Sequence, residues 1–337
     1  MTILGIETSC DECSAALVED GTTILANVIR SQIPVHAPYD GVVPELASRM
    51  HTEWIQDVVA CAFKEGRTEI GAIDGIAVTV EPGLIGSLLV GLSYAKGLSL
   101  ASGKPLAGIN HIKAHLYAPR LEQEVAYPYL GLLVSGGHTI LALVEDFDTM
   151  NVIGTTIDDA CGEAFDKVAK HFGFGYPGGT AIEKLAEQGN EKAFSFPMPS
   201  LHKGEHRYDF SYSGLKTAVI NQLDQFWNRD FEKNDCNIAA SFQKAAIQML
   251  LGRVKRAVRD FGISRIVAGG GVAANSSLRR GLLALKNVQV VLPSKVLCTD
   301  NAAMIAGIGY HYLKSGNASP LSLTVRSRVP GFRKIYP

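Results

Sequence analysis

The chain has 337 residues, of which 47% are hydrophobic and 19% charged, with 34 glycines. This length suits two domains of roughly 150 residues each, and the composition excludes a disordered chain, a collagen and a disulfide-rich mini-protein. Lysine and arginine number 32 against 33 acidic residues, a net charge of −1, so a nucleic-acid partner would need locally clustered basic residues.

The N-terminus reads MTILGIETSC, which lacks the basic and apolar regions of a secretory signal. We therefore expect a cytoplasmic protein whose six cysteines are free thiols, because reducing compartments rarely keep disulfides. The longest apolar stretch, 83–100, contains Lys96 and several glycines. It predicts a buried helix and no membrane span.

A segment near the N-terminus recurs later in the chain. Residues 4–20 (LGIETSCDECSAALVED) align without gaps with residues 130–146 (LGLLVSGGHTILALVED), at an offset of 126 and with 8 of 17 positions identical. Each copy has an apolar strand, a small polar turn and a second β-rich run, which predicts a hairpin. We interpret the match as an internal duplication that opens each of two related lobes.

Helices and strands alternate after each hairpin. After the first, the pattern predicts helices over 45–64, 84–101 and 111–121, and strands over 76–80 and 106–109. After the second, it predicts helices over 158–172, 237–261, 274–285 and 299–313, and strands over 265–267 and 288–292. Such alternation predicts parallel-rich α/β layers.

The duplication also predicts the domain organisation. We expect an N-terminal lobe over 1–122 and a C-terminal lobe over 123–337, with an insertion around 176–236 that is rich in Gly, Pro, Lys and His. Ligands favour domain interfaces, so a ligand cleft is expected between the two lobes.

The two hairpin turns differ in chemistry. Residues 134–139 (VSGGHT) combine two glycines with hydroxyls, and backbone N–H groups in such a loop suit phosphate or carboxylate oxygens, although an ordinary hairpin turn also uses glycine. Residues 7–12 (ETSCDE) hold three carboxylates, which suit a general base or a cation, unless they only form an exposed acidic turn. Because the turns occupy equivalent places, we expect both to contact one ligand.

Two histidines, His111 and His115, are spaced i, i+4 and share one face of the predicted helix over 111–121. That spacing suits a shared metal ion with Asp300 as a candidate third ligand, and this ligand set suits Fe(II) or Zn(II). The alternative is a pair of helix-surface or capping histidines. Ile112 stands where an HExxH peptidase needs its glutamate, which argues against peptidase chemistry.

Four further clusters are candidates for ligand or partner binding. Acidic residues at the start of the helix over 158–172 either complement the helix dipole or bind a ligand; they are Asp159, Glu163 and Asp166. Residues 269–275 (GGGVAAN) lie between a strand and a helix, an arrangement that binds phosphate. Two basic clusters are either solvated faces or surfaces for an anionic partner; they are Arg253, Lys255, Arg256 and Arg259, and Arg326, Arg328, Arg333 and Lys334.

Nine motifs follow one another along the whole chain. They are GIETSCDE (5–12), GVVPELASR (41–49), NHIKAHL (110–116), LVSGGHT (133–139), DDACGEAFDK (158–167), YPGG (176–179), DFSYSGLKTA (209–218), GGGVAAN (269–275) and CTDNAAMIA (298–306). Together they resemble the TsaD family, whose archaeal and eukaryotic relative is the Kae-type subunit of the KEOPS complex. The resemblance implies an α/β, actin-like fold of the acetate kinase, sugar kinase, Hsp70 and actin superfamily, with two related lobes and a central ligand cleft.

The resemblance also implies an activity, an acyl transfer. A threonylcarbamoyl group would pass from threonylcarbamoyl-adenylate to N6 of adenosine 37 in tRNAs reading codons that begin with adenine (t6A biosynthesis). The implied partners are the tRNA, a TsaB-like paralogue and a TsaE-like ATPase. The alternatives are an ATP-dependent small-molecule kinase of the same superfamily, which would hold Mg²⁺ through carboxylates and water, and a non-catalytic paralogue that scaffolds a complex.

The resemblance assigns site residues as well. It implies one Fe²⁺ per subunit, or alternatively Zn²⁺, on His111, His115 and Asp300. It implies adenylate contacts at Leu133, Val134, Ser135, Gly136, Gly137, Asp166, Gly179 and Asn275. Asp11 and Glu12 match residues implied in catalysis, and one of them is expected to take the proton of the attacking amine. The chain departs from the family pattern at Glu81, Ala114, Cys161 and Ala273, and Glu81 bears on the course of the loop before the helix over 84–101.

Overall fold

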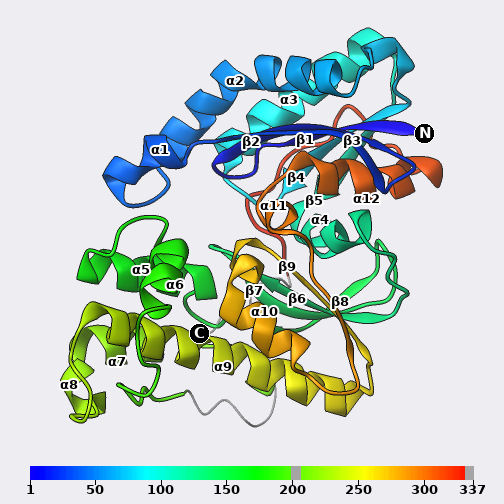
Figure 1. Cartoon of the computed structure of the whole chain (residues 1–337). Helices are drawn as coiled ribbons and strands as arrows, with labels where there is room; N and C mark the ends of the chain where they lie inside the picture. Colours follow the sequence, from blue (N-terminus) through cyan, green and yellow to red (C-terminus); the bar gives the residue numbers. More distant parts are fainter. Residues whose placement is uncertain (199–205, 331–337) are drawn as a thin grey trace. The chain divides into compact units, whose positions relative to one another are not determined.

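The computed structural model of the chain describes residues 1–198 and 206–330. By their contacts these residues form two compact units, the first made of 1–125 and 293–330 and the second of 126–292. Among the described residues, each unit contains one five-stranded mixed sheet with helices packed against it (Figure 1). The predicted α/β class is therefore confirmed.

The first sheet is built around the N-terminal hairpin. Its strands, in spatial order, are β3 (Thr23–Ser31), β2 (Glu12–Glu19), β1 (Thr2–Glu7), β4 (Gly75–Glu81) and β5 (Leu106–Asn110). β1 pairs antiparallel with β2, and Thr2 lies opposite Glu19, whereas β1, β4 and β5 run parallel. Parallel strands end at the same edge of a sheet, so β1, β4 and β5 deliver the residues that follow them to one place.

Helices cover this sheet on both faces. Leu4 and Ile6 belong to a core cluster with residues of α2 (Pro44–Glu65) and α3 (Ile85–Ser102). Gly5, which points the opposite way because side chains alternate along a strand, lies against α12 (Ala302–Lys314). A Cβ at Gly5 would lie 2.2 Å from the carbonyl oxygen of Ala302. Only glycine therefore lets α12 pack this closely on β1.

The second sheet repeats the topology of the first. In the same sense of spatial order its strands are β8 (Met150–Thr155), β7 (Thr139–Val144), β6 (Tyr129–Val134), β9 (Arg265–Gly269) and β10 (Gln289–Val291). β6 and β7 form the second hairpin, and β6, β9 and β10 run parallel. This shared order and direction confirms the two hairpins and supports the predicted duplication.

The helices of the second unit pack on one another and on this sheet. They are α5 (Cys161–Phe172), α6 (Gly178–Ala186), α7 (Ser213–Asn221), α8 (Leu223–Phe226), α9 (Asp235–Phe261) and α10 (Ser276–Leu283). The long helix α9 contacts α6, α7, α10 and β6. The predicted insertion around 176–236 supplies α6, α7 and α8 and includes 199–205, which lie outside the described residues.

The division into units differs from the predicted one at the C-terminal end. The prediction assigned everything after residue 122 to the C-terminal lobe, but 293–330 packs with the first unit. The physical reason is that α12 buries its apolar side chains against β1, β2 and β4. The segment 293–330 has the same helical and apolar pattern as the residues before it. The sequence therefore does not indicate that this segment packs with the first unit.

Some element boundaries also differ from the prediction. The helix predicted over 158–172 begins at Cys161, and the one predicted over 274–285 begins at Ser276, after a 3₁₀ turn over 271–274. The segment predicted over 111–121 is α4 (His111–Tyr117) followed by a 3₁₀ turn. β3 and β8 were not predicted.

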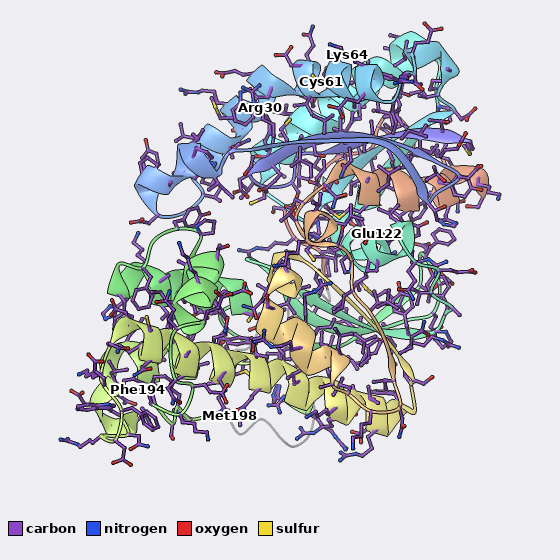
Figure 2. All side chains as sticks on the ribbon, viewed as in Figure 1. Arg30, Cys61, Lys64, Glu122, Phe194 and Met198 are labelled. Atoms are coloured by element: carbon purple, nitrogen blue, oxygen red, sulfur yellow. The ribbon has the colours of Figure 1, made fainter. Side chains whose placement is uncertain are left out.

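The prediction of free cysteines is confirmed, whereas the helix predicted over 83–100 is less buried than expected. All six cysteines are free thiols, as expected, and Cys61 is exposed on α2 (Figure 2). The stretch over 83–100 does form a helix, α3, but only 33% of that helix is buried. By length and composition α3 alone among the described residues could span a membrane, a test that core helices also pass.

Candidate metal centre

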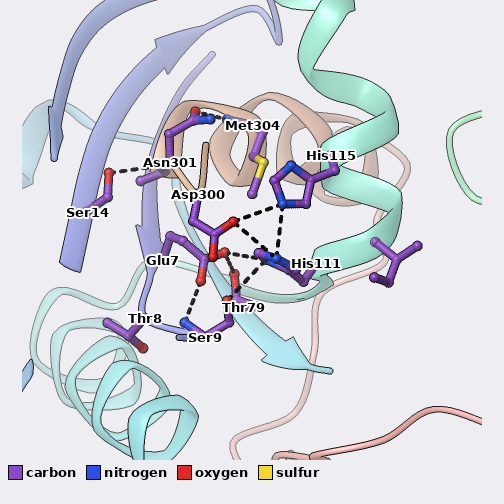
Figure 3. A network of polar contacts seen from close by, with 12 residues as sticks. Glu7, Thr8, Ser9, Ser14, Thr79, His111, His115, Asp300, Asn301 and Met304 are labelled. Carbon is purple, nitrogen blue, oxygen red and sulfur yellow. Dashed lines mark hydrogen bonds and ion pairs between the residues drawn. The ribbon is translucent and has the colours of Figure 1, made fainter. Parts of the chain in front are cut away.

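The three predicted metal ligands lie together within the first unit. His115 Nε2 is 3.1 Å from His111 Nε2 and 3.0 Å from Asp300 Oδ1, and His111 Nε2 is 3.5 Å from the same carboxylate oxygen (Figure 3). One ligand atom from each residue lies within 4.8 Å of the others. Both imidazoles are buried, with exposed fractions of 7% and 1%. The structure thus favours a shared site over two surface histidines.

Local capping explains why both histidines face this point. β5 ends at Asn110, whose Oδ1 accepts hydrogen bonds from the backbone N–H groups of Ile112 and Lys113 at 3.0 and 3.2 Å. An N-cap of this kind starts a helix at the next residue, so His111 is the first residue of α4. His115 follows one turn later on the same face.

The cap residue is itself held by Glu81, one of the four residues that depart from the family pattern. Asn110 Nδ2 donates to Glu81 Oε1 at 3.1 Å, and the other oxygen of Glu81 lies 2.7 Å from Nε of Arg326. The backbone N–H of Arg326 in turn donates to the carbonyl of Val80. Glu81 therefore connects the end of β4, the start of α4 and the C-terminal segment.

Asp300 reaches the histidines because α12 begins just after it. Asn301 caps α12, since its Oδ1 accepts from the N–H of Met304 at 3.1 Å. The N–H of Ala302 donates to Ser14 Oγ at 2.9 Å, which fixes this end of α12 on β2. The close approach at Gly5 and these two bonds together place Asp300 opposite α4.

Three residues around His111 were not predicted in this role. Glu7 Oε2 lies 3.0 Å from His111 Nδ1, and Thr79 Oγ1 donates to the same oxygen at 2.6 Å. Ser9 Oγ lies 3.2 Å from His111 Nδ1. Glu7 was counted only among the carboxylates of the acidic turn. The one available signal was that residues 7, 79 and 111 all stand at or next to ends of predicted strands.

The charges of this cluster are strongly coupled. Burial lowers the pKa of His111, but the negative charges of Asp300 and Glu7 outweigh it and raise that pKa to about 9. Burial and the charge of His111 both lower the pKa of His115. Burial raises the pKa of Glu7, but His111 outweighs it and the net pKa is lowered. Without a bound ion, His111 is therefore the cation that balances the carboxylates.

The two predicted catalytic acids, Asp11 and Glu12, lie at the start of β2 in the same unit. Glu12 Oε1 accepts a hydrogen bond from Ser31 Oγ at 3.2 Å. Burial, with the nearby charges of Asp11 and Asp300, raises the pKa of Glu12 to about 10. Glu12 is therefore protonated at neutral pH and cannot accept a proton in this state.

The predicted adenylate contacts lie in the second unit, where two glycine-containing turns and the start of α5 meet. Leu133 and Val134 are buried in β6, and Ser135–Gly137 form the β6–β7 turn, in which the N–H of Ser135 donates to His138 O at 2.8 Å. The N–H of Gly162 in α5 donates to Ser135 O at 3.2 Å. A Cβ at Gly270 would lie 2.5 Å from Val134 O. The start of α5 and the 269–271 turn therefore both lie against the β6–β7 turn.

The remaining residues predicted to contact the adenylate are Asp166, Gly179 and Asn275, and hydrogen bonds hold them or their neighbours in place. Asp166 Oδ1 accepts from the N–H of Gly178 at 2.8 Å, just before Gly179 in α6. Asn275 Oδ1 accepts from the first N–H groups of α10, and its Nδ2 donates to Gln243 Oε1 at 2.7 Å. These bonds fix which way the Asn275 amide points.

The acidic cluster and the two basic clusters differ in what the structure shows of them. Asp159 precedes α5 and forms ion pairs with Lys167 and Lys216. Glu163 accepts from the N–H of Ala160 at the start of α5, which supports the structural interpretation of this acid. In the first basic cluster, Arg253 is buried and donates through Nε to Asp209 O. In the second, Arg333 and Lys334 lie outside the described residues.

Comparison with known proteins gives matches along the whole chain. A family model, TsaD, described as tRNA N6-adenosine threonylcarbamoyltransferase, matches residues 23–307. A protein of that name from Treponema denticola is 60% identical over 334 residues, which cover 99% of each chain. Proteins of the same name from Treponema pallidum and Borrelia recurrentis are 54% and 53% identical over 99% of this chain, covering 95% and 98% of their own lengths.

Solved structures give a more distant likeness. Full-length HypF in its phosphate- and nucleotide-bound form has a TM-score of 0.63 at 16% identity, over 94% of this chain and 47% of that one. Component A of the Acidaminococcus fermentans (R)-2-hydroxyglutaryl-CoA dehydratase has a TM-score of 0.55 at 14% identity, over 93% and 99%. Both are actin-like ATPase-fold proteins, so this likeness supports the predicted actin-like fold.

Proposed function

The chain belongs to the TsaD family of tRNA N6-adenosine threonylcarbamoyltransferases, and we propose that it transfers the threonylcarbamoyl group of threonylcarbamoyl-adenylate to N6 of adenosine 37 in tRNAs reading codons that begin with adenine. The observation that carries this proposal is the convergence of His111, His115 and Asp300 in a chain with full-length relatives of that name. The comparisons give no support to the small-molecule kinase. A pure scaffold would have no need for the buried histidine pair.

Within this proposal, His111, His115 and Asp300 hold a divalent metal ion, Fe²⁺ or alternatively Zn²⁺. The residues fit such an ion, because two imidazole nitrogens and one carboxylate oxygen meet at 3.0–3.5 Å and are the donor types that both metals accept. A bound ion would supply a Lewis acid and a template for the threonylcarbamoyl oxygens. It would also replace the proton that His111 otherwise carries.

The remaining steps fall to the chain's own residues. The exocyclic amine of adenine attacks the carbamoyl carbon, AMP leaves, and the amine loses a proton. Asp11 accepts that proton, since Glu12 already carries one. General base catalysis of this kind contributes about 10²–10⁴-fold. The exposed turn at Gly136 and Gly137 offers backbone N–H groups to the phosphate of the adenylate.

The partners are part of the same proposal. They are the tRNA, a TsaB-like paralogue and a TsaE-like ATPase, and a tRNA substrate is consistent with a cytoplasmic location. Helix α3 exposes Ile85 and Leu89, one turn apart, with exposed fractions of 51% and 48%. Two large apolar side chains on one helix face suit a protein partner better than water.

The experiment that tests the metal centre uses His111→Ala with His171→Ala, an exposed histidine on α5, as the matched control. Metal content is measured by elemental analysis, and t6A is measured by mass spectrometry of digested tRNA. We expect His111→Ala to lose both the metal and the product, whereas the control keeps both. A His111→Ala protein that retains metal and activity would refute the centre.

A further inference from the structure

A carboxylate that is not itself one of the predicted ligands lies behind the metal centre. Glu7 is the last residue of β1, and its side chain is fully buried. A carboxylate is removed from water at a large cost unless its oxygens accept hydrogen bonds. Glu7 satisfies that requirement with three donors, two of which come from other parts of the chain. The first unit therefore maintains a buried charge at this position.

The donors hold Glu7 in one orientation. Its Oε1 accepts from the backbone N–H of Ser9 at 2.5 Å, and its Oε2 accepts from Thr79 Oγ1 at 2.6 Å and faces His111 Nδ1 at 3.0 Å (Figure 3). Thr79 stands on β4, next to β1, where Ile6 pairs with Val78. The carboxylate is thus held by a residue of β4 and by the backbone of the turn that follows β1.

This arrangement determines which nitrogen of His111 is free. A carboxylate that already accepts from Thr79 can only accept from His111, so the imidazole proton stays on Nδ1. The unprotonated nitrogen of the neutral ring is then Nε2, which points to His115 Nε2 and Asp300 Oδ1. A histidine that binds a metal through one nitrogen and donates to a carboxylate through the other is held in place and made a stronger donor.

The internal repeat has no carboxylate at the equivalent strand end of the second unit. At the offset of 126 residues, Glu7 corresponds to Leu133, near the end of β6 in the same sheet position. Leu133 is as fully buried as Glu7. The second unit therefore ends the same strand with an apolar side chain, and the carboxylate in the first unit is distinguished by its contact with His111.

We propose that Glu7, anchored by Thr79, is the positioning residue of the metal centre: it holds His111 as the Nδ1–H tautomer with Nε2 directed at the ion. This inference rests on the proposed metal centre. It predicts that Glu7 affects metal affinity and the ligand field without contacting the ion.

The test measures Co²⁺ binding to the full chain by the visible absorption of the bound ion. Glu7→Gln keeps the size of the side chain but removes its charge, and we expect the dissociation constant to rise about 10–100-fold, with a changed absorption spectrum. His111→Ala is measured beside it. If His111→Ala still binds Co²⁺ as the wild type does, the metal centre itself is refuted; if it loses Co²⁺ but Glu7→Gln binds with unchanged affinity and spectrum, only the role of Glu7 is refuted.

A second pair of variants covers the case in which Glu7→Gln fails to fold. Thr79→Val removes the hydroxyl that anchors Glu7, whereas Thr79→Ser keeps it. We expect Thr79→Val to weaken Co²⁺ binding several-fold and to alter the spectrum, and Thr79→Ser to restore wild-type behaviour. Equal affinity and equal spectra for Thr79→Val and wild type would overturn the inference.

Discussion

Two acidic side chains, Asp11 and Glu12, are adjacent in the sequence but differ in their surroundings. Glu12 accepts from Ser31, and burial together with the neighbouring charges of Asp11 and Asp300 raises its pKa to about 10. A group with that pKa is protonated throughout the neutral range, where glutamine is its close structural equivalent. The two residues are therefore expected to respond differently to amide substitution.

The first prediction follows from that difference. Glu12→Gln should retain activity within a few-fold near neutral pH, whereas Asp11→Asn should lose about 10²–10⁴-fold because the base is removed. Single-turnover formation of t6A on tRNA measures both variants. The reverse order of effects would show that Glu12 is the base.

The carboxylate of Asp159 has a pKa that makes the stability of the fold depend on pH. Burial raises its pKa, but hydrogen bonds and ion pairs with Lys167 and Lys216 outweigh that effect and lower the pKa below its usual 3.8. A depressed pKa stabilises the folded state above the unfolded-state value, and this stabilisation is lost as the pH falls through the folded-state value.

The second prediction is that Asp159→Asn lowers the free energy of unfolding by about 1 kcal/mol near neutral pH. The difference from wild type should shrink as the pH falls below about 4. Urea unfolding at several pH values measures it, with Asp57→Asn on the exposed face of α2 as the control. A difference that stays constant with pH would show that the ion pairs contribute nothing.

At the residue scale, the sequence indicated the histidine pair because i, i+4 spacing is a local property of a helix. Glu7 was missed in its role because 104 residues separate it from His111. The contact depends on which parallel strands become neighbours, and hydrophobic patterns do not specify that order. The protonation of Glu12 was missed for a related reason, since it depends on burial by distant parts of the chain.

Among the elements, α12 packs on β1 at a point where a side chain on the strand would not fit. It lies on β1 at Gly5 and begins just after Asp300. A side chain at Gly5 would push the start of α12 away from the sheet, because the obstacle is the backbone oxygen of Ala302 at 2.2 Å from the added Cβ. The position of Asp300 thus depends on a glycine in another element.

The third prediction is that Gly5→Ala destabilises the protein by about 1–3 kcal/mol and weakens metal binding. Gly97→Ala is the matched control, since Gly97 is an exposed position within α3 and a Cβ there would meet nothing within 4 Å. Alanine should stabilise that helix by about 0.5–1 kcal/mol. Thermal unfolding and metal titration measure both variants, and similar effects of the two changes would contradict the packing argument.

The sequence predicted whether a segment forms a helix or a strand better than it predicted where that helix or strand begins and ends. The helices α2 and α9 were predicted from their apolar periodicity, α3 from its long apolar stretch, and the strands β4 and β9 from short apolar runs between helices. β3 was not predicted because it is largely exposed along its length and its apolar residues do not alternate cleanly. α5 begins three residues later than predicted because Asp158 binds Ser211 and the backbone around α7 instead of joining the helix.

For the whole molecule, the internal repeat predicted two sheets of the same topology. It did not predict that 293–330 would pack with the first unit and supply Asp300 to the site. The near-zero net charge means that the chain as a whole does not attract a nucleic acid. A tRNA substrate is compatible with that charge if the tRNA is bound by local basic patches or by partner proteins, and Arg253 is removed from such a patch by its burial.

The most direct test of the central claim is transfer to a defined nucleoside. The purified chain, with its TsaB-like and TsaE-like partners, is incubated with threonylcarbamoyl-adenylate and unmodified tRNA that carries either adenosine or guanosine at position 37, and t6A is measured by mass spectrometry. We predict t6A in the adenosine 37 tRNA alone, and none with the His111→Ala chain. Absence of t6A with the wild-type chain, or equal product with His111→Ala, would contradict the account.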